Sequence, residues 1–160
     1  MANITHTPVL IVILLLGAAF TVALLSKHLQ VARYVFLITS AVVLLLSARL
    51  TFIVLEHGTI SYTLGGWAPP FGIELVVDAF AAFSSLVMAG VSSIIFWFAV
   101  FGPREVKNEA GYYSLLLLLT AAMHGMVMTG DLFNLFVFVE ISSLAAIAII
   151  AVKGTSESIR

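Results

Sequence analysis

The sequence predicts an all-α integral membrane protein of about five transmembrane helices, on three observations. Hydrophobic residues make up 62% of the chain and charged residues only 9%, with a mean hydropathy of +1.18. A soluble domain of this composition would expose large apolar patches. Five apolar segments have the roughly 20 residues that cross about 30 Å of hydrocarbon. Finally, positively charged residues occur in alternate links between these segments.

The first two segments span residues 8–25 and 31–55. Thr7 can cap the first helix, and Pro8 suits the first helical position, where a backbone N–H would have no helical partner in any case. Lys27 lies in the polar interruption between the segments, which begins at Ser26, and no Lys or Arg precedes it. Because a secretory signal would begin with positive charge, we expect the first apolar run to remain as a helix.

The other three segments are 75–101, 112–128 and 132–152. Gly102 and Pro103 stop the third segment, because proline cannot continue a helix. The fourth and fifth segments are separated only by residues 129–131, so they should form an antiparallel helical hairpin. We expect residues 1–160 to form a single membrane domain.

The positions of Lys and Arg predict the orientation in the membrane, since short cytoplasmic loops are enriched in both. The first link, the third link and the tail contain Lys27, Arg33, Arg104, Lys107, Lys153 and Arg160. The N-terminal segment, the second link and the fourth link contain neither residue type. We therefore predict an N-terminus outside and a C-terminus in the cytoplasm. Arg49 is an exception near the outer end of the second helix, where its side chain can extend to the interface.

The link between the second and third helices has a strand-like pattern. Residues 59–64 alternate in polarity, and Gly65 and Gly66 supply a turn. We predict a short hairpin or extended cap on the outer surface, with Trp67 near the lipid headgroups.

Composition argues against several classes of function. With seven Lys and Arg against eight Asp and Glu, the chain has no basic patch for nucleic acid. It has no cysteine for iron–sulfur clusters, disulfides or thiol nucleophiles, and its four scattered histidines lack metal-binding spacing. We expect no cofactor, no metal and no catalytic site within this chain. If electrons flow nearby, as in a redox-driven complex, another chain carries them.

Glu140 is the most informative position for function. It lies nine residues beyond Asp131, hence about 13 Å into the fifth helix and close to the bilayer centre. An ionised carboxylate there costs about 2.5–3.5 kcal/mol, so it needs a partner, a water-filled cavity or a proton. Burial favours a neutral carboxyl and a nearby cation favours the charged form, so a moving charge can switch it. This predicts a proton relay; the alternative is a permanently protonated Glu140 that bonds a neighbouring helix.

Two further polar residues lie within the predicted helices near Glu140. His124 precedes Gly130 by six residues, and histidine ordinarily changes charge near neutral pH. It either passes protons between Glu140 and the outer side or hydrogen-bonds between helices. Asn134 either holds water on an ion path or bridges helices, which is the usual role of such residues.

Two aspartates lie at predicted helix starts. Asp131 occupies a capping position, where an acid stabilises the first turn, and it could also line an ion path. Asp78 lies one turn into the third segment, with Glu74 before it. Asp78 is either stabilised by the helix dipole or lines an entry funnel for cations, and both interpretations remain open.

Two motifs resemble a known family of membrane subunits. Residues 129–145 read TGDLFNLFVFVEISSLA, and residues 65–78 read GGWAPPFGIELVVD. Both are similar to the D-type subunit of multisubunit Na+/H+ antiporters of the Mrp (Mnh) type, and to the antiporter-like subunits of membrane-bound hydrogenases and complex I. With the tail KGTSES at residues 153–158, the resemblance covers nearly the whole chain.

The resemblance implies a role for Glu140. In the family, the glutamate of the fifth helix pairs with a lysine of the seventh helix on a proton path across the membrane. That lysine has no counterpart in this chain. The family subunit has about fourteen helices, including two inverted repeats, so the resemblance is to its N-terminal part. A naturally split subunit and a shortened paralogue both fit.

We therefore predict a membrane subunit of a multisubunit cation/proton antiporter, or of a related energy-converting complex, in a prokaryotic cell membrane. Glu140 would contribute to the translocation of H+ or Na+. The partners would be lipid and other membrane subunits, which would supply the missing cation. One alternative is a structural subunit that packs between modules or binds lipid without transporting ions. Another is a small transporter that works alone as an oligomer.

Overall fold

Apolar helices form most of the structure, a computed structural model that describes residues 6–67, 72–102, 106 and 108–153. The long helices are α1 (Thr7–Leu24), α2 (Leu29–His57), α3 (Ala79–Phe101), α4 (Glu109–Met128) and α5 (Leu132–Lys153). The shorter elements are the 3₁₀ helices η1 (Leu25–Lys27) and η2 (Leu64–Gly66) and the strands β1 (Ile60–Thr63) and β2 (Glu74–Val77). All five long helices are apolar enough to cross a membrane, which confirms the predicted fold class.

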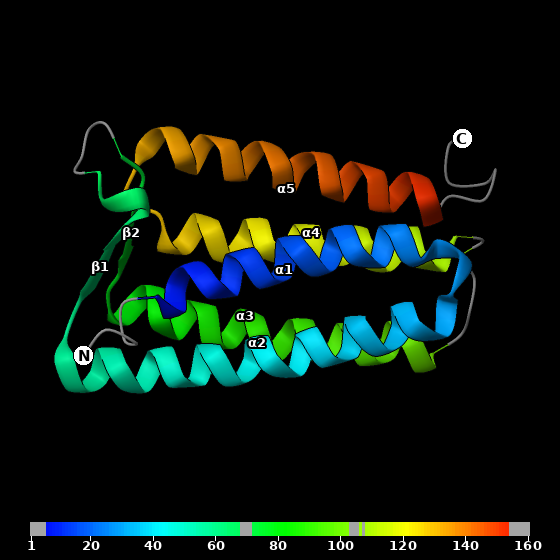
Figure 1. Cartoon of the computed structure of the whole chain (residues 1–160), viewed down its shortest axis with the longest axis horizontal. Helices are drawn as coiled ribbons and strands as arrows, with labels where there is room; N and C mark the ends of the chain where they lie inside the picture. Colours follow the sequence, from blue (N-terminus) through cyan, green and yellow to red (C-terminus); the bar gives the residue numbers. More distant parts are fainter. Residues whose placement is uncertain (1–5, 68–71, 103–105, 107, 154–160) are drawn as a thin grey trace.

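The five helices run side by side along the long axis of the molecule, with α2 and α5 at opposite edges (Figure 1). Helix α1 packs against α2 and α4, α2 packs against α3, and α5 packs against α4. The start of α1, the strands and the α4–α5 link lie at one end, which we call the hairpin end. The η1 turn and the end of α5 lie at the opposite end. The side of the membrane that each end faces stays a prediction, and Arg104, Lys107 and Arg160 lie outside the described residues.

Aromatic side chains hold α2, α3 and α4 together toward the end of the bundle that lies opposite the hairpin end. The ring of Phe36 stacks on Phe96 at 4.1 Å and on Tyr113 at 4.7 Å between centroids. All three side chains are almost completely buried. Lipid tails are as apolar as these side chains, so close packing and interhelical hydrogen bonds stabilise the bundle more than burial from water does.

Hydroxyl groups supply the interhelical hydrogen bonds between α2 and α3. Ser40 donates to Ser93 at 2.9 Å, and the hydroxyls of Ser47 and Ser85 lie 3.1 Å apart. The single hydroxyl hydrogen of Thr51 is shared between the Ser47 carbonyl of its own helix at 2.9 Å and the Ala82 carbonyl of α3 at 3.2 Å. Such bonds satisfy polar groups in hydrocarbon and fix how one helix meets the next.

The strand predicted at residues 59–64 is present as β1, and it pairs antiparallel with β2 from Ile60↔Val77 to Thr63↔Glu74. The predicted start of the third helix at residue 75 is therefore wrong, because β2 occupies residues 74–77. A short apolar run fits a buried strand as well as a helix. Trp67 is 69% exposed beside this hairpin, and its place relative to lipid headgroups stays a prediction.

Capping explains where two helices begin. Asp78 is the N-cap of α3 rather than a residue of its second turn, because its Oδ1 accepts a hydrogen bond from the Ala81 N–H at 2.8 Å. Asn108 caps α4 by accepting from the Gly111 N–H at 3.0 Å, so α4 begins at Glu109, three residues before the predicted start.

The first helix departs from its predicted cap, whereas Pro8 and Gly102 take the places that the sequence predicts for them. Thr7 lies inside α1 rather than capping it, while Pro8 occupies the first turn as predicted. Helix α2 ends at Gly58, whose φ of +79° is a left-handed conformation that favours glycine. Gly102 ends α3 as predicted, with its N–H donating to the Phe98 carbonyl; Pro103 lies outside the described residues.

Candidate functional site

Helix α5, which carries Glu140, is the least covered of the five helices. Only 11% of its apolar window is buried, against 50% for α4. Its buried side chains, Asn134, Phe138 and Ala145, follow helical spacing and form a single stripe against α4. The opposite face exposes Leu132, Phe133, Phe136, Leu144, Ile147 and Ile150. This face, which we call the open face of α5, is apolar except for Glu140 and Ser143, which are also exposed on it.

Glu140 is exposed on the open face. It follows Phe138 by two residues, or about 200° around the helix, so it points away from α4. Within the described part of the chain, no hydrogen bond or ion pair holds its carboxylate. A charged Glu140 in the bilayer would therefore need its partner from another segment or another chain.

His124 is completely buried in α4. Its Nδ1 lies 2.9 Å from the Thr120 carbonyl, and because a carbonyl only accepts, Nδ1 carries the hydrogen. The other ring nitrogen, Nε2, is buried near the backbone of Ser85 and has no hydrogen-bond partner among the described residues. His124 thus faces α3, while Glu140 faces away from α4, and the structure does not bring the two together.

The start of α5 is held by the polar side chains that precede it. The Asp131 carboxylate accepts hydrogen bonds from the N–H groups of Phe133 at 3.1 Å and Asn134 at 3.3 Å, as the capping interpretation predicts. Asn134 Nδ2 donates to Thr129 Oγ1 at 3.0 Å, and the Asn134 side chain is buried. These contacts fix the first turn of the helix that carries Glu140.

The hairpin contacts the link between α4 and α5. The Gly130 N–H donates to the Glu74 carbonyl at 2.8 Å, and Thr129 forms an isolated antiparallel bridge with Leu75. The two motifs at residues 65–78 and 129–145 are therefore neighbours in space. Asp78 is exposed at this end of the bundle, where it caps α3.

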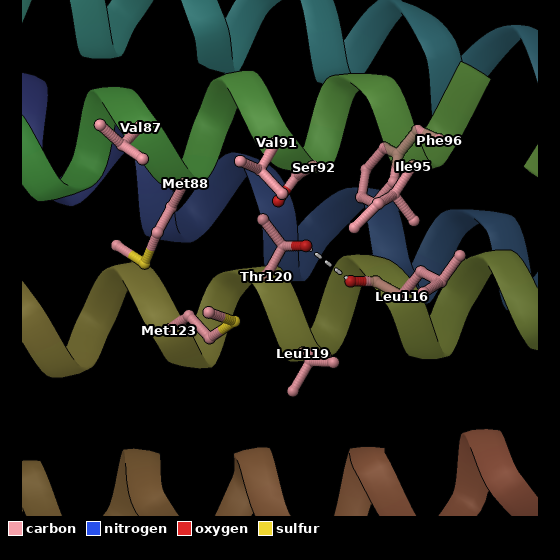
Figure 2. Close-up of a pocket in the computed structure, with 10 residues that line it drawn as sticks. All are labelled: Val87, Met88, Val91, Ser92, Ile95, Phe96, Leu116, Leu119, Thr120 and Met123. Atoms are coloured by element: carbon pink, nitrogen blue, oxygen red, sulfur yellow. Dashed lines mark hydrogen bonds between the residues drawn. The ribbon is translucent and has the colours of Figure 1, made fainter. Parts of the chain in front are cut away.

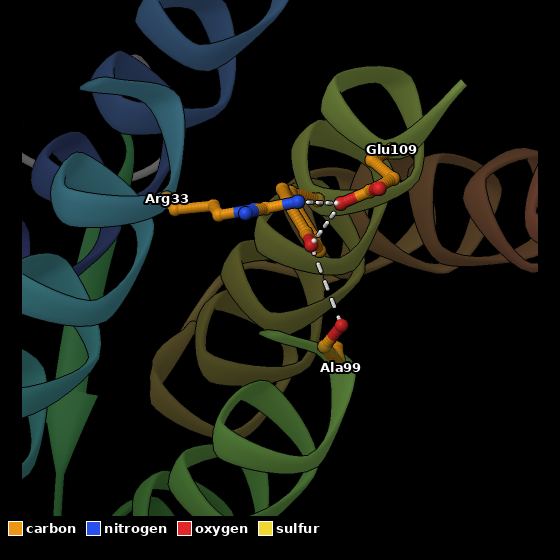
Figure 3. Close-up of polar contacts among 4 residues, drawn as sticks. Arg33, Ala99 and Glu109 are labelled. Carbon is orange, nitrogen blue, oxygen red and sulfur yellow. Dashed lines mark hydrogen bonds and ion pairs between the residues drawn. The ribbon is translucent and has the colours of Figure 1, made fainter. Parts of the chain in front are cut away.

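A largely buried ion pair lies at the opposite end, and sequence reasoning missed it. Arg33 Nη2 lies 2.7 Å from Glu109 Oε2, with side-chain exposures of 11% and 18% (Figure 3). The hydroxyl of Tyr113 is 2.8 Å from the same oxygen and 3.3 Å from the Ala99 carbonyl. Tyrosine has one hydroxyl hydrogen, so the nearer carboxylate is the main acceptor. The sequence signals were an arginine early in an apolar segment and a glutamate in a charged link, but pairing across 76 positions is not readable from them.

Two pockets of about 190 Å³ lie elsewhere, and neither is lined by Glu140. One opens between α3 and α4 and is almost entirely apolar, with Met88, Met123 and Thr120 on its walls (Figure 2). The other lies between α1, the hairpin and α5, with Asn134 as its polar residue. No cluster of three metal-ligating side chains occurs among the described residues.

The fold and the site together define a multi-pass integral membrane protein whose last described helix presents a carboxyl group on an uncovered apolar face. Known proteins share both the sequence and the fold. The chain is 37% identical over 153 residues to the N-type NADH-quinone oxidoreductase subunit of Desulforudis audaxviator. It is 31% identical over 160 residues to the D-type Na(+)/H(+) antiporter subunit of Bacillus subtilis. These alignments cover 93% and 100% of the chain.

Two solved membrane complexes contain a similar fold. A chain of the membrane-bound sulfane sulfur reductase, an archaeal respiratory membrane complex, superposes on 95% of this chain with a TM-score of 0.86 at 35% identity. A chain of the Mrp complex from Dietzia sp. DQ12-45-1b superposes on 94% with a TM-score of 0.81 at 28% identity. No protein-family model matches the chain.

The chain is thus homologous to the antiporter-like membrane subunits of Mrp-type antiporters and complex I-like assemblies, as the two motifs predicted. It is a multi-pass protein of a prokaryotic plasma membrane. The chain spans about a third of the length of its relatives, 30% of the oxidoreductase subunit and 32% of the antiporter subunit. It spans 31% and 28% of the two structural matches.

Proposed function

We propose that this chain is a membrane subunit of a multisubunit cation/proton antiporter or of a related energy-converting complex, and that Glu140 takes part in translocating H+ or Na+. The carrying observation is the carboxyl group of Glu140 on the open face of α5, without a partner among the described residues. The names of the homologous proteins support the coarser part of the proposal.

Membrane energetics link the position of Glu140 to this role. An ionised carboxylate facing lipid near the bilayer centre costs about 2.5–3.5 kcal/mol on insertion scales. Other protein segments that cover the open face would offer Glu140 a cation, a hydrogen bond or enclosed water. A carboxyl group that exchanges a proton for a nearby positive charge can then load and release H+.

The proposed partners follow from the open face of α5. Helices α1 to α4 bury side chains against one another, whereas α5 is covered on one side only. Residues 1–160 would form one membrane domain that packs through α5 against further membrane subunits, with lipid on the remaining faces. Such subunits would supply the basic group that faces Glu140.

Substitution of Glu140 in the assembled complex tests the proposal. E140Q and E140A should each lower ion flux per complex by on the order of 10²-fold, the lower range for loss of a proton-transferring group. E56Q is a matched control, because Glu56 lies near the end of α2 with a 75% exposed side chain. Unchanged flux in both Glu140 variants would remove the proposed role.

A structural subunit that transports no ions is the competing function, and the absence of charged residues around the pocket in Figure 2 favours it. It predicts normal flux in E140A and failure of assembly when the chain is deleted. A third possible function is that of a transporter that works alone. The purified chain in liposomes would then move protons in response to a cation gradient.

A further inference from the structure

One glycine of α4 lies directly against an aromatic ring of α5. A Cβ atom added at Gly125 would lie 2.3 Å from Cε1 and Cζ of Phe138 and 2.5 Å from Cε2. Side chains do not approach a ring so closely, so only glycine fits while Phe138 keeps its place. Phe138 is 9% exposed and packs with Val12 and Ala122 in a small apolar cluster. The ring of Phe138 therefore fills a hole that the missing side chain of Gly125 creates.

The contact anchors the rotation of α5 about its own axis as long as the Phe138 ring keeps its rotamer. Each residue of an α-helix turns the chain by about 100°, so Phe138 and Glu140 are about 200° apart. With the Phe138 ring held in the hole at Gly125, Glu140 is held on the open face. A rotation that moved the ring out of the hole would turn the Glu140 carboxyl toward a flank of the helix.

A second contact holds the start of α5 at the hairpin end. A Cβ at Gly130 would lie 2.6 Å from Cγ2 of Val76, and the Gly130 N–H donates to the Glu74 carbonyl. Because Val76 is β-branched, its side chain has few alternative rotamers with which to relieve this contact. It limits where α5 begins, whereas Gly125 and Phe138 determine which way the middle of the helix faces.

We infer that Gly125 and Phe138 are positioning residues that set the direction in which α5 presents the Glu140 carboxyl to whatever covers the open face. The inference rests on the proposed function of Glu140 for its effect on flux. Its geometric part, that the ring in the hole fixes the direction of Glu140, stands on the contact itself. Close packing that only stabilises the bundle is the competing explanation.

The test compares G125A with G90A in the assembled complex. Gly90 is a matched control, since it lies within α3 and a Cβ there would meet nothing within 4 Å. The double variant G125A/F138L removes part of the ring that the new methyl would strike. Three quantities are measured per assembled complex: the pH profile of ion flux, the flux itself, and the rate at which a hydrophobic carbodiimide modifies Glu140, followed by mass spectrometry.

We expect G125A to shift the pH profile and to lower flux by about tenfold to 10²-fold, the size of effect that a displacement of about 1 Å can produce. The rate of Glu140 modification should change with it. G125A/F138L should restore all three quantities toward those of G90A and the unsubstituted complex. G125A that lowers the amount of complex but leaves all three per-complex quantities unchanged overturns the inference in favour of packing alone.

Two further results have a defined consequence for the inference. If G125A yields no complex, F138L alone is measured, and an unchanged pH profile together with an unchanged modification rate overturns the inference. If E140Q retains full flux, the proposed function fails. The modification rate at Glu140 in G125A and G125A/F138L then still decides whether this contact sets the direction of the carboxyl.

Discussion

Glu109 and Glu140 are both acidic side chains of apolar helices, and their surroundings are opposite. Glu109 begins α4, where it is bound by Arg33 and Tyr113 and is largely buried. Glu140 lies in the middle of α5 on its open face, with no hydrogen bond or ion pair among the described residues. A charge with partners inside its own bundle stabilises that bundle. A charge without them is available to an ion or to another subunit.

The largest expected difference is in stability. E109Q leaves the Arg33 guanidinium without its counter-ion and should lower the free energy of unfolding by about 3 kcal/mol, the low end for a broken buried pair, because both side chains keep some exposure. E140Q removes no contact within the described chain, so its change should stay within about 0.5 kcal/mol. Reversible denaturation in mixed micelles measures both. Equal losses of unfolding free energy in E109Q and E140Q would contradict the proposed difference between the two glutamates.

A smaller effect is expected at Tyr113, which shares the Glu109 oxygen with Arg33. Y113F keeps the ring that stacks on Phe36 and removes only the hydroxyl. The loss of one hydrogen bond to a charged group should cost about 1.5 kcal/mol. The same denaturation measurement checks it, with Y112F as the control, because Tyr112 is a partly buried neighbour with no hydrogen bond of its hydroxyl among the described contacts. No difference between Y113F and Y112F would contradict the role given to the hydroxyl.

The N-cap of α5 should contribute less to the free energy of unfolding than the Tyr113 hydroxyl does. D131A removes the acceptor for two N–H groups at the start of the helix and should cost about 1 kcal/mol. D131N, which can still cap, should recover most of it. Hydrogen exchange of the first turn of α5 measures the effect directly. Faster exchange spread over the whole bundle, rather than confined to that turn, would show that Asp131 does more than cap.

The smallest effect is expected at His124. Its ring faces α3 while Glu140 faces away from α4, so H124L should leave ion flux per complex unchanged. Flux assays of the assembled complex, normalised to the amount of chain, make the comparison. A loss as large as that of E140Q would instead support His124 as part of a proton relay.

The features that sequence could predict are those fixed by composition and spacing. Length and hydropathy placed five spanning helices, and the distance from Asp131 placed Glu140 about 13 Å into the last one. The features it could not predict depend on neighbours. Residues 75–77 are apolar in either a helix or a strand, and only pairing with β1 makes them β2.

The same dependence on neighbouring segments explains why the surroundings of Glu109 and Glu140 could not be predicted from the sequence. Arg33 and Glu109 are far apart in the chain, and the packing of α2 against α4 brings them together. The direction of Glu140 depends on which residues of α5 meet α4, and this follows from the contact of Gly125 with Phe138. A glycine in an apolar helix gives no sequence signal of what packs against it.

Ion flux through the assembled complex, measured side by side for E140Q and E109Q and normalised to the amount of complex, tests the account most directly. We predict that E140Q loses nearly all flux while it assembles normally, and that E109Q assembles less well but keeps its flux per complex. Full flux in E140Q, or equal loss of flux per complex in both variants, would contradict the distinction between a partnered and an available carboxyl group.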